Sequence, residues 1–421
     1  MKATDLRDIL TYASHFRDRL FVIHIDSLLL ENAENLFTDF AVLRSLNIRL
    51  ILVFGISARL QRLAQAQGKT IGDTDGIGVT DEATLTLARL AAGEEGQEIL
   101  RLLANYNLKG SLNNAVWAHP AGIIQGVNHQ FTGKVEKVDA HFLETLLNQH
   151  IIPVISPIVF DGDGRTYCVN ADQAAARVAQ VMKASKLIYM TAGLSAPDAR
   201  ELTEQEAEVF LEKNKATLHP ALRRKIDCSI QACKGRVHRC HILDGQNDEA
   251  LFNELFSKSG IGTMIYTNEY KAIRCATQKD VTEILNLIEN SVASQELARW
   301  SRQDILDCLS DFYVFEIDGS IVGCVTLKML HQQPKVAEMG CLFVSGRYEN
   351  RGIGSRLIQY AEKRAHELGV QRLLALSTQA FHYLEKKGGF QEGGIEILPE
   401  NRLKKYEASK RNSKILYKDL V

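Results

Sequence analysis

The sequence predicts two α/β domains in succession: an α/β/α sandwich around a mostly parallel sheet, then a smaller α/β domain with a mixed sheet. The length of 421 residues is enough for two or three domains with buried cores. Short runs rich in Val, Ile and Leu alternate with helical patterns up to about residue 215, as in parallel strands covered by helices on both faces. Beyond about residue 270 several strands come in succession before a long helix, an order typical of a mixed sheet.

The first domain is expected to contain four buried strands and several helices. A parallel strand covered on both faces reads as a continuous apolar run, whereas a surface helix repeats its apolar residues every three or four positions. By these patterns the strands are 20–25, 49–54, 151–158 and 186–190, and the helices are 6–16, 82–92 and 171–184.

A polar, glycine-punctuated stretch separates the two domains. We expect them to span residues 1–265 and 275–421, with a linker over 266–274. The strands expected in the second domain are 272–276, 313–317, 321–329, 336–344 and 372–377, and the helices are 281–288, 301–310, 354–368 and one more after the last strand.

Composition excludes several classes of protein. With 50 basic and 51 acidic residues the formal net charge is -1, so no overall field favours nucleic acid or an anionic membrane as a partner. The apolar runs fall far short of the roughly 18 residues that would span a bilayer, and the first residues lack the pattern of a signal peptide. The eight scattered cysteines are therefore expected to be reduced thiols in the cytoplasm.

A glycine turn after an apolar strand carries the most chemical information. The strand 336–344 runs toward Gly352-Ile353-Gly354, where the long helix begins. Bare backbone N–H groups at a helix start, together with the helix dipole, hold a pyrophosphate well. The alternative is a turn that is rich in glycine for steric reasons alone.

This stretch resembles the acetyl-CoA loop of the GNAT acetyltransferases, whose signature is Arg/Gln-x-x-Gly-x-Gly/Ala. Gly352 and Gly354 match its glycines, whereas Glu349 stands where the basic or amide residue is usual. The resemblance implies acetyl-CoA as co-substrate, with its phosphates left to backbone N–H groups and to Arg347 or Arg351. The alternative is that the turn survives without the ligand. The implied cofactor-binding residues are Leu342, Phe343, Val344, Arg347, Arg351, Gly352, Ile353, Gly354 and Ser355.

Motifs near the expected domain boundary narrow the resemblance. Residues 235–238, 241–245, 254–256 and 260–265 resemble the hinge region of the bacterial N-acetylglutamate synthase family, in which an amino-acid-kinase-like domain precedes a GNAT domain. The resemblance implies transfer of acetyl from acetyl-CoA to the α-amino group of L-glutamate, the first step of arginine biosynthesis, under feedback control by L-arginine. It also implies a homo-oligomer, with a hexamer expected.

The first domain lacks what phosphoryl transfer requires. A kinase of this fold needs a lysine and bare glycine turns after its first two strands, because crowded phosphates require backbone donors and a cation. Here the first turn contains His24 and Asp26, and the second reads Gly55-Ile56-Ser57. We expect a domain that kept the fold and lost the kinase reaction, as the resemblance also implies.

Such a domain can instead hold an effector. In arginine-sensitive relatives arginine lies between the hinge and an N-terminal helix, which implies Tyr12, Glu254, Gly260 and Gly262 as its contacts. Glu254 would bind the cation by a charge-assisted hydrogen bond. The alternative is that Glu254 is a solvated helix residue and the glycines form a cap. Inhibition is what the bacterial family implies, and the residues leave the sign of the response open.

Acetyl transfer to an α-amino group needs a base for the ammonium proton and a donor for the developing oxyanion. Glu338 is a carboxylate within an apolar strand, where burial would make it a stronger base; a strand-edge charge or a partner for a buried arginine is the alternative. Cys341 would face the other way unless the strand bulges at Gly340, and a buried thiol is the alternative to a nucleophile. Ser377 resembles the position that assists the departing thiolate, with helix capping as the alternative. Tyr383 lies near the tyrosine acid of many GNAT enzymes, but its altered spacing leaves it without an assigned role.

The acceptor has two carboxylates, so guanidinium groups and hydroxyl donors are expected to bind it. Arg411 and Ser413 lie two residues apart, are expected to share a strand face, and resemble the substrate contacts of the family. Arg302 matches another such position, although Trp300 interrupts the usual pattern. A solvated basic tail is the alternative.

No metal is expected. The chain does contain a group of potential soft ligands, but their spacing fits no common zinc site. They are Cys228, Cys233, His238, Cys240 and His241.

The sequence thus favours an N-acetyltransferase that uses acetyl-CoA and L-glutamate, with L-arginine as effector and neither nucleic acid nor a membrane as partner. A non-catalytic arginine sensor with a degenerate acetyltransferase domain is the main alternative, because Glu349 occupies the pyrophosphate turn. A second alternative is a kinase that acts on an acylated amino acid, and the missing lysine argues against it. A GNAT enzyme for another amine is the third alternative.

Overall fold

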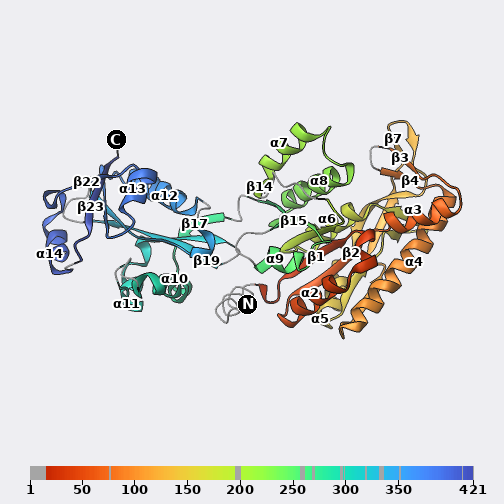
Figure 1. The fold of residues 1–421 in the computed structure, drawn as a ribbon, viewed down its shortest axis with the longest axis horizontal. Coiled ribbons are helices and arrows are strands. Elements are labelled where there is room, and N and C mark those ends of the chain that lie inside the picture. The colour runs from red at the N-terminus through yellow and green to blue at the C-terminus, as the bar shows by residue number, and fades with distance from the viewer. Residues whose placement is uncertain are drawn as a thin grey trace. The chain divides into compact units, whose positions relative to one another are not determined.

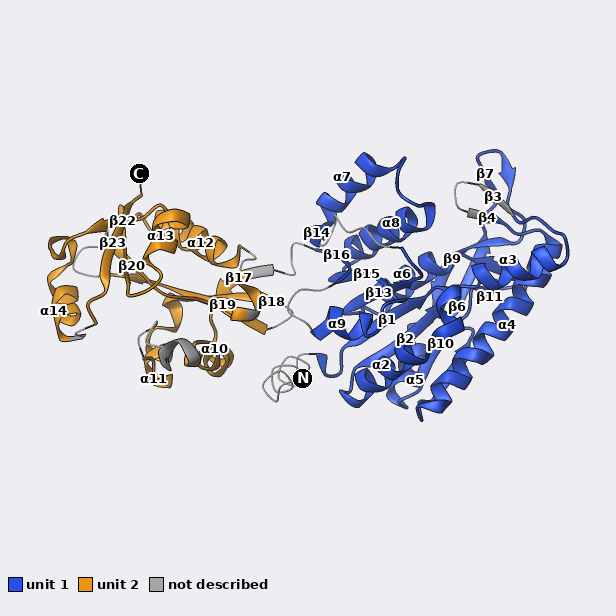
Figure 2. Cartoon of the chain, in the orientation of Figure 1, with its two compact units in different colours: residues 1–269 blue, residues 270–421 orange. Residues whose placement is uncertain are grey.

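The computed structural model describes residues 16–74, 77–194, 201–256, 261–267, 271–293, 297, 299–317, 320–330, 336–349, 352–409 and 411–420. The chain divides into two compact units, 1–269 and 270–421 (Figure 2). The division falls within the stretch expected to be the linker, and a strand reaches into each end of that stretch. Tyr12 and the helix expected around it lie outside the described residues.

An eight-stranded sheet forms the centre of the first unit (Figure 1). Its strand order is β14-β16-β15-β13-β1-β2-β10-β5, in which all neighbours from β15 to β5 are parallel and β16 is antiparallel to β15. The strands are β1 (Leu20–Ile25), β2 (Arg49–Phe54), β5 (Gly110–Asn113), β10 (Ile152–Ile155), β13 (Lys186–Thr191), β14 (Glu201–Thr203), β15 (Arg239–Asp244) and β16 (Thr263–Tyr266).

Helices cover both faces of this sheet, which confirms the predicted sandwich. Successive strand residues point to opposite faces, so Val22 packs in the core beneath α6 and α8, while Ile23 packs in the core with α2, α4 and α9. The helices of the unit are η2 (Ser27–Asn32), α2 (Glu34–Ser45), α3 (Ser57–Ala66), α4 (Glu82–Asn105), α5 (Ala140–Asn148), α6 (Ala171–Val181), α7 (Glu204–Asn214), α8 (Pro220–Lys234) and α9 (Ala250–Phe256).

The expected helix 82–92 was too short. Its glycines do not end it: α4 runs on for 24 residues, and a Cβ atom on Gly96 would lie only 3.0 Å from Leu112 Cδ1, so this glycine allows the helix to approach β5 closely.

The expected strand 151–158 was also wrong, because it is two strands. Pro157, which lacks the N–H that a ladder needs, separates β10 from β11, and β11 belongs to a small closed barrel with β12, β9 and β6. The elements missed in this region are β3 (Gly72–Thr74), β4 (Ile77–Val79), β6 (Val116–Pro120), β7 (Ile123–Ile124), β8 (Val127–Asn128), β9 (Thr132–Val138), β11 (Ile158–Phe160) and β12 (Thr166–Val169).

The second unit is built on a seven-stranded mixed sheet of order β17-β18-β19-β20-β21-β23-β22, antiparallel except for the pair β20 and β21. Figure 1 shows α12 and α13 on one side of it and α10 and α11 on the other. The strands are β17 (Lys271–Cys275), β18 (Phe312–Ile317), β19 (Ser320–Met329), β20 (Val336–Val344), β21 (Arg372–Ser377), β22 (Gln391–Gly393) and β23 (Lys414–Asp419).

Nine helical segments accompany this sheet in the described residues. They are η4 (Gln278–Asp280), α10 (Val281–Ala293), α11 (Arg302–Asp307), η5 (Leu309–Asp311), η6 (Gly346–Tyr348), α12 (Ile353–Glu367), α13 (Phe381–Gly388), η7 (Ile395–Ile397) and α14 (Glu400–Ser409). The sequence had not predicted α14, and the strand expected around Arg411 and Ser413 begins only at Lys414, as β23. Across the part of the chain that the structure describes, we find no helix with the length and apolar character needed to cross a membrane.

Candidate active site

The strand β20 carries a bulge beside the predicted catalytic residues. The ladder with β19 shifts register so that Cys341 and Leu342 together oppose the single residue Val325. The bulge was expected at Gly340, but Gly340 stays paired with Thr326, and it is Cys341 that adopts a left-handed conformation, with φ 45°. Glu338 and Cys341 both line the cavity beside this bulge, although a regular strand would place their side chains on opposite faces.

A cavity of about 510 Å³ opens where β20 and β21 separate. The parallel ladder between these strands ends at the pair Met339 and Ala375, although both strands continue beyond it. The cavity lining combines polar side chains from β19, β20 and α14 with apolar side chains. Its lining comprises Leu297, Trp300, Thr326, Lys328, Met329, Leu330, Glu338, Gly340, Cys341, Leu376, Thr378, Pro399, Asn401, Arg402, Lys405, Tyr406, Arg411 and Ser413.

Glu338 is paired with Arg402, so it does have the arginine partner considered as its alternative, although the sequence did not identify which arginine. Arg402 donates from Nε to one carboxylate oxygen at 2.6 Å and from Nη2 to the other at 2.8 Å, and the side chains of Glu338 and Arg402 are only 17% and 21% exposed. The two residues are 64 positions apart, and Arg402 lies on α14, so no local pattern pointed to their contact. Such a bidentate pair fixes the plane and direction of the carboxylate.

Arg411 and Ser413 reach the cavity from a coil rather than from a strand. Both lie before β23, which begins at Lys414, and Asn412 between them has φ 50°, so the expectation that they share a strand face was wrong. A left-handed residue interrupts the alternation that a shared face requires. The hydroxyl of Tyr406 donates to the Ser413 carbonyl at 2.8 Å and ties this coil to α14.

Two other predicted residues lie outside the cavity lining. Arg302 is exposed at the start of α11, and its Nη1 donates to Thr282 Oγ1 at 3.0 Å. Ser377 accepts a hydrogen bond from the Ala380 N–H at 2.9 Å, in the turn that leads into α13. Ala380 is the N-cap residue of this helix and α13 has no side-chain cap, so the bond stabilises the turn and is not the helix cap expected as the alternative. The residue after Ser377, Thr378, lines the cavity.

The glycine turn after β20 has the features of an anion cradle. Gly352 precedes α12 in a left-handed conformation, with φ 73°, and contributes no side-chain cap, so the first N–H groups of this 15-residue helix lack a side-chain acceptor there. A Cβ atom on Gly354 would lie 2.6 Å from the Tyr383 hydroxyl, which itself lies 3.2 Å from Ser355 Oγ. The described part of the chain does not include Arg351 or the side chain of Arg347.

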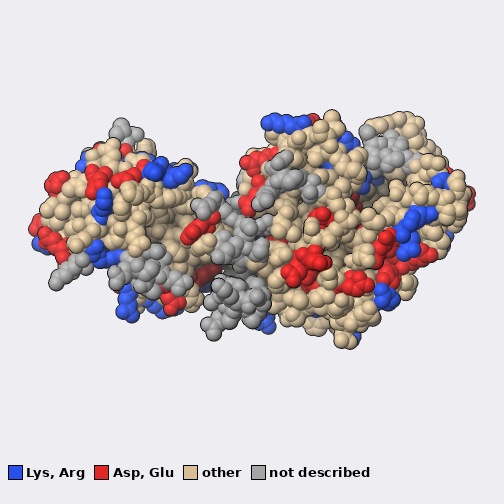
Figure 3. Space-filling model, in the orientation of Figure 1, with Lys and Arg blue, Asp and Glu red and all other residues tan. Residues whose placement is uncertain are grey.

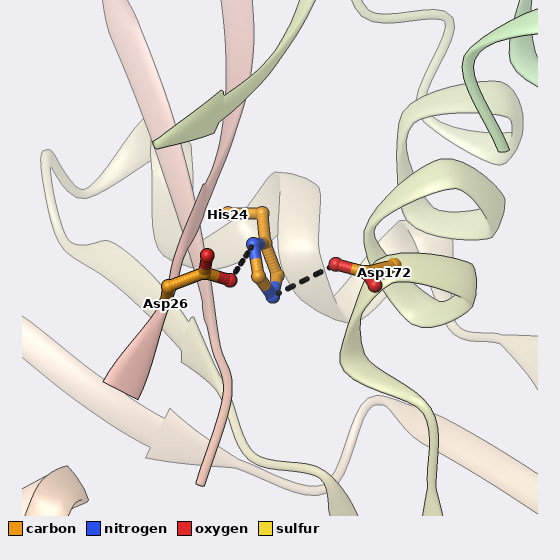
Figure 4. A group of neighbouring side chains, drawn as sticks. All are labelled: His24, Asp26 and Asp172. Carbon is orange, nitrogen blue, oxygen red and sulfur yellow. Dashed lines mark ion pairs between the residues drawn. The ribbon is translucent and has the colours of Figure 1, made fainter. Parts of the chain in front are cut away.

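In the first unit, a buried charge network occupies the turn where a kinase would need lysine and glycines. His24 lies between two carboxylates, with Nδ1 3.7 Å from Asp26 Oδ1 and Nε2 3.5 Å from Asp172 Oδ1 (Figure 4). Lys225 Nζ donates to the same two oxygens at 2.9 and 2.5 Å, and Arg224 Nε donates to Asp172 Oδ2 at 2.8 Å. The network forms part of the wall of a cavity of about 590 Å³.

The charges of this network balance one another. Burial and the charge of Lys225 lower the pKa of His24 to about 4, so its imidazole is neutral near pH 7. Burial alone would raise the pKa of Asp172, but Lys225, His24 and Arg224 hold it well below its usual range. His24, Asp26 and Asp172 lie close enough to share a metal ion, but the positive charges of Lys225 and Arg224 already balance the two carboxylates, so we assign no metal to them.

Glu254 on α9 is buried and joins β15 to the segment before β16 by hydrogen bonds, so it is not the solvated residue considered as an alternative. Its side chain is 4% exposed; Oε1 lies 2.7 Å from His241 Nδ1, and Oε2 accepts from the N–H groups of Ile261 and Gly262 at 2.7 and 2.9 Å. Burial alone would raise its pKa, but His241 and the two backbone donors lower it to about 2. Gly262 has no room for a side chain, because a Cβ atom would lie 2.2 Å from Leu243 Cδ2. Gly260 lies outside the described residues.

Comparison with known proteins places both units in established families. Residues 19–244 match the Amino acid kinase family, and residues 279–390 match the Acetyltransferase (GNAT) family. An amino-acid acetyltransferase from Neisseria meningitidis serogroup B is 33% identical over 445 aligned residues that cover 100% of both chains. The chain belongs to the amino-acid acetyltransferase (N-acetylglutamate synthase) family.

Other relatives of this acetyltransferase agree with that assignment. The amino-acid acetyltransferase of Pasteurella multocida is 29% identical, with 100% of this chain and 99% of the relative covered. The crystal structure of N-acetylglutamate synthase from Neisseria gonorrhoeae complexed with coenzyme A and L-arginine is 33% identical and covers 100% of this chain and 99% of its own, with a TM-score of 0.87. The structure of the same enzyme complexed with coenzyme A and N-acetyl-glutamate has a TM-score of 0.64 at 33% identity and full coverage of both chains.

The family and the fold predicted from the hinge and glycine-loop motifs are therefore confirmed. This member of the N-acetylglutamate synthase family is an acyltransferase with an amino-acid-kinase fold followed by a GNAT fold. The cavity beside the β20 bulge lies in the GNAT unit. The buried Glu254 and its hydrogen-bond partners in the hinge region lie in the kinase-like unit.

Proposed function

We propose that this enzyme transfers the acetyl group of acetyl-CoA to the α-amino group of L-glutamate and that L-arginine regulates it. The observation that carries the proposal is the cavity at the end of the β20–β21 ladder, which is lined by the Glu338 carboxylate, held by Arg402, and by further basic side chains. The strand β20 that borders this cavity leads to the start of α12, where the N-cap residue provides no side-chain cap. The relatives from Neisseria gonorrhoeae support it, because one was solved with coenzyme A and L-arginine and the other with coenzyme A and N-acetyl-glutamate.

The proposed reaction is direct attack on the thioester. Glu338 accepts a proton from the substrate ammonium, the freed amine attacks the acetyl carbon, a C–N bond forms and the C–S bond breaks. Arg402 keeps the Glu338 carboxylate directed into the cavity. The backbone at the Cys341 bulge supplies the donor for the oxyanion, with the Cys341 side chain as part of the wall. As the C–S bond breaks, the attacking nitrogen loses its second proton, and the Ser377 hydroxyl relays this proton to the departing thiolate, so that the serine ends protonated as it began.

Acetyl-CoA would be bound along the end of β20 and by the first turn of α12. The backbone N–H groups at Gly352, Ile353, Gly354 and Ser355 would hold the pyrophosphate, since the helix dipole favours an anion there. Glu349 is exposed and lies before this turn, so it does not close the first turn of α12 with a side-chain cap. No metal is needed for this chemistry, because the thioester is already activated.

The function is tested by thiol release from acetyl-CoA in the presence and absence of glutamate, with Arg411→Ala as the informative variant. We expect glutamate-dependent release by the wild type and a KM for glutamate at least about tenfold higher in the variant, because a guanidinium that lines the cavity is lost. The KM for acetyl-CoA should stay within about twofold.

Equal changes in both KM values would refute Arg411 as an acceptor contact. No thiol release by the wild type at saturating substrates would favour the non-catalytic arginine sensor instead. Comparing glutamate with aspartate and a polyamine as acceptors in the same assay tests the alternative of another amine. Arg302, which lies outside the cavity lining in this structure, is a second proposed acceptor contact, and its alanine variant belongs in the same series.

The effector site is tested by calorimetric titration of L-arginine into the wild type and Glu254→Gln. We expect arginine to bind the wild type and to bind the variant at least about tenfold more weakly, because an amide lacks the charge that a guanidinium requires. Both Glu254 oxygens already accept hydrogen bonds within the hinge, so arginine would have to exchange with these partners.

A matched control for this titration is Asp248→Asn, since Asp248 is a carboxylate shortly before α9 that pairs with Asn35 instead of the hinge. Unchanged arginine affinity in Glu254→Gln, or equal weakening in both variants, would contradict the assignment. Activity measured with and without arginine gives the sign of the response.

We further propose that the enzyme is a cytoplasmic homo-oligomer, with the hexamer as the state to test by light scattering. All eight cysteines are free thiols, which agrees with a reducing compartment.

A further inference from the structure

Two lysines that no sequence motif singled out line the candidate acceptor cavity: Lys328 on β19 and Lys405 on α14. Among the described residues that line the cavity, they make four basic side chains with Arg402 and Arg411, against one carboxylate, that of Glu338. The whole chain has a formal net charge of -1, and Figure 3 shows acidic and basic side chains interspersed over the surface it draws. The positive excess is therefore a local property of this cavity.

Lys328 faces the cavity without neutralising Glu338. The two residues are direct partners across the β19–β20 ladder, so their side chains leave the same face of the sheet. Both carboxylate oxygens of Glu338 are taken by Arg402, at 2.6 and 2.8 Å. Among the ion pairs formed within the described residues, those of Glu338 and the α14 lysines do not include Lys328.

The helix α14 separates its charges between two faces. Asn401, Arg402, Lys405 and Tyr406 line the cavity, a spacing that places them along one side of a helix. Lys404, next to Lys405 in sequence, is outside the lining and pairs with Glu400 at 3.2 Å. The basic residues that face the cavity are therefore a feature of one side of the helix rather than of the whole helix.

We propose that Lys328 and Lys405 form an anion subsite at the exposed edge of the cavity, where they bind the side-chain carboxylate of the acceptor and so select dicarboxylic over neutral amino acids. The inference rests on the proposed function and deepens it by naming acceptor-selecting residues. Both lysines are exposed, so their attraction for an anion is screened by salt and acts mainly on association. Arg411 and Ser413, nearer to β23, would complete the grip on the substrate.

The test is the double variant Lys328→Gln/Lys405→Gln in the full chain, assayed with glutamate and with glutamine, its neutral isostere, at saturating acetyl-CoA. We expect kcat/KM for glutamate to fall about tenfold at low ionic strength, with kcat and the KM for acetyl-CoA within about twofold. The preference for glutamate over glutamine should fall by the same factor. Added salt should lower kcat/KM of the wild type toward that of the variant and change the variant much less.

Lys404→Gln is the matched control, since it removes the same charge from the same helix outside the cavity, and it should behave as the wild type. A double variant with the wild-type preference for glutamate and the wild-type salt dependence would overturn the proposal. An equal loss toward acetyl-CoA would overturn it too. A wild type that releases no thiol with glutamate refutes the proposed function itself, whereas an active wild type with an insensitive double variant refutes only the lysine subsite.

Discussion

Glu338→Gln is expected to lower kcat for glutamate acetylation by about 10²-fold to 10⁴-fold, the range for loss of a positioned general base. Glutamine has the shape of glutamate but cannot accept the ammonium proton. The substitution also directs an amide NH₂ toward one of the two Arg402 nitrogens that now donate at 2.6 and 2.8 Å, so the clamp is weakened as well. Steady-state kinetics at saturating concentrations of both substrates measures this effect.

The pH profile separates a lost base from a disturbed structure. If Glu338 removes the ammonium proton, raising the pH should restore much of the activity of the variant, because the substrate amine then loses its proton to solvent. Glu392→Gln is the matched control: Glu392 is a carboxylate of the same unit that pairs with Lys414, and its loss should change kcat less than about twofold. A Glu338→Gln enzyme within about fivefold of wild-type kcat at neutral pH would exclude Glu338 as the base.

The largest effect on stability is expected for Asp172→Asn, which should lower the free energy of unfolding of the first unit by about 3–5 kcal/mol. Asp172 accepts from Lys225 with one oxygen and from Arg224 with the other, and the side chains of Asp172 and Lys225 are 4% and 2% exposed. Removing the carboxylate charge leaves the buried ammonium without its main partner. The two tryptophans, Trp117 and Trp300, lie one in each unit, so fluorescence of a Trp300→Phe background reports urea unfolding of the first unit alone.

A second substitution tests the cause. Lys225→Met combined with Asp172→Asn removes the uncompensated charge together with its former partner, and it should recover most of the lost stability. A single-variant loss below about 1 kcal/mol, or a double variant less stable than Asp172→Asn, would contradict a buried charge pair as the origin of the effect.

Acid should lower the folding stability of the first unit of the wild type, because the buried His24 must then take up a proton. His24 has a pKa of about 4 in the folded chain and 6.5 when exposed, so the unfolded state binds its proton first as the pH falls. The stability linked to His24 is complete above pH 6.5 and is lost between pH 6.5 and 4, by roughly 3 kcal/mol. His24→Asn should flatten this part of the pH curve.

At the candidate site, the local sequence indicated candidate residues but not the partners with which they interact. Glu338 and Gly354 were found because a carboxylate inside an apolar strand and a glycine at a helix start are visible in the local sequence. The bulge was placed one residue too early, since both Gly340 and Cys341 are compatible with it and only the pairing with β19 decides between them. Arg302 was assigned to the acceptor by resemblance, yet here its guanidinium reaches Thr282 on α10.

The sequence by itself determined the strands β1, β2, β20 and β21 and the family of both units, because buried strands and glycine turns are written in consecutive residues. Only the tertiary structure decided which charges meet. It pairs Arg402 with Glu338 across 64 positions and Lys225 with Asp172 across 53, and it places Lys405 and Lys328 in the lining of one cavity. An ion pair forms when two distant backbones approach within a few ångströms, and that approach depends on strand order, on helix packing and on one bulge. Strand order, helix packing and the position of a bulge produce no periodic pattern in the sequence. The ion pairs that depend on them are therefore visible only in the folded structure.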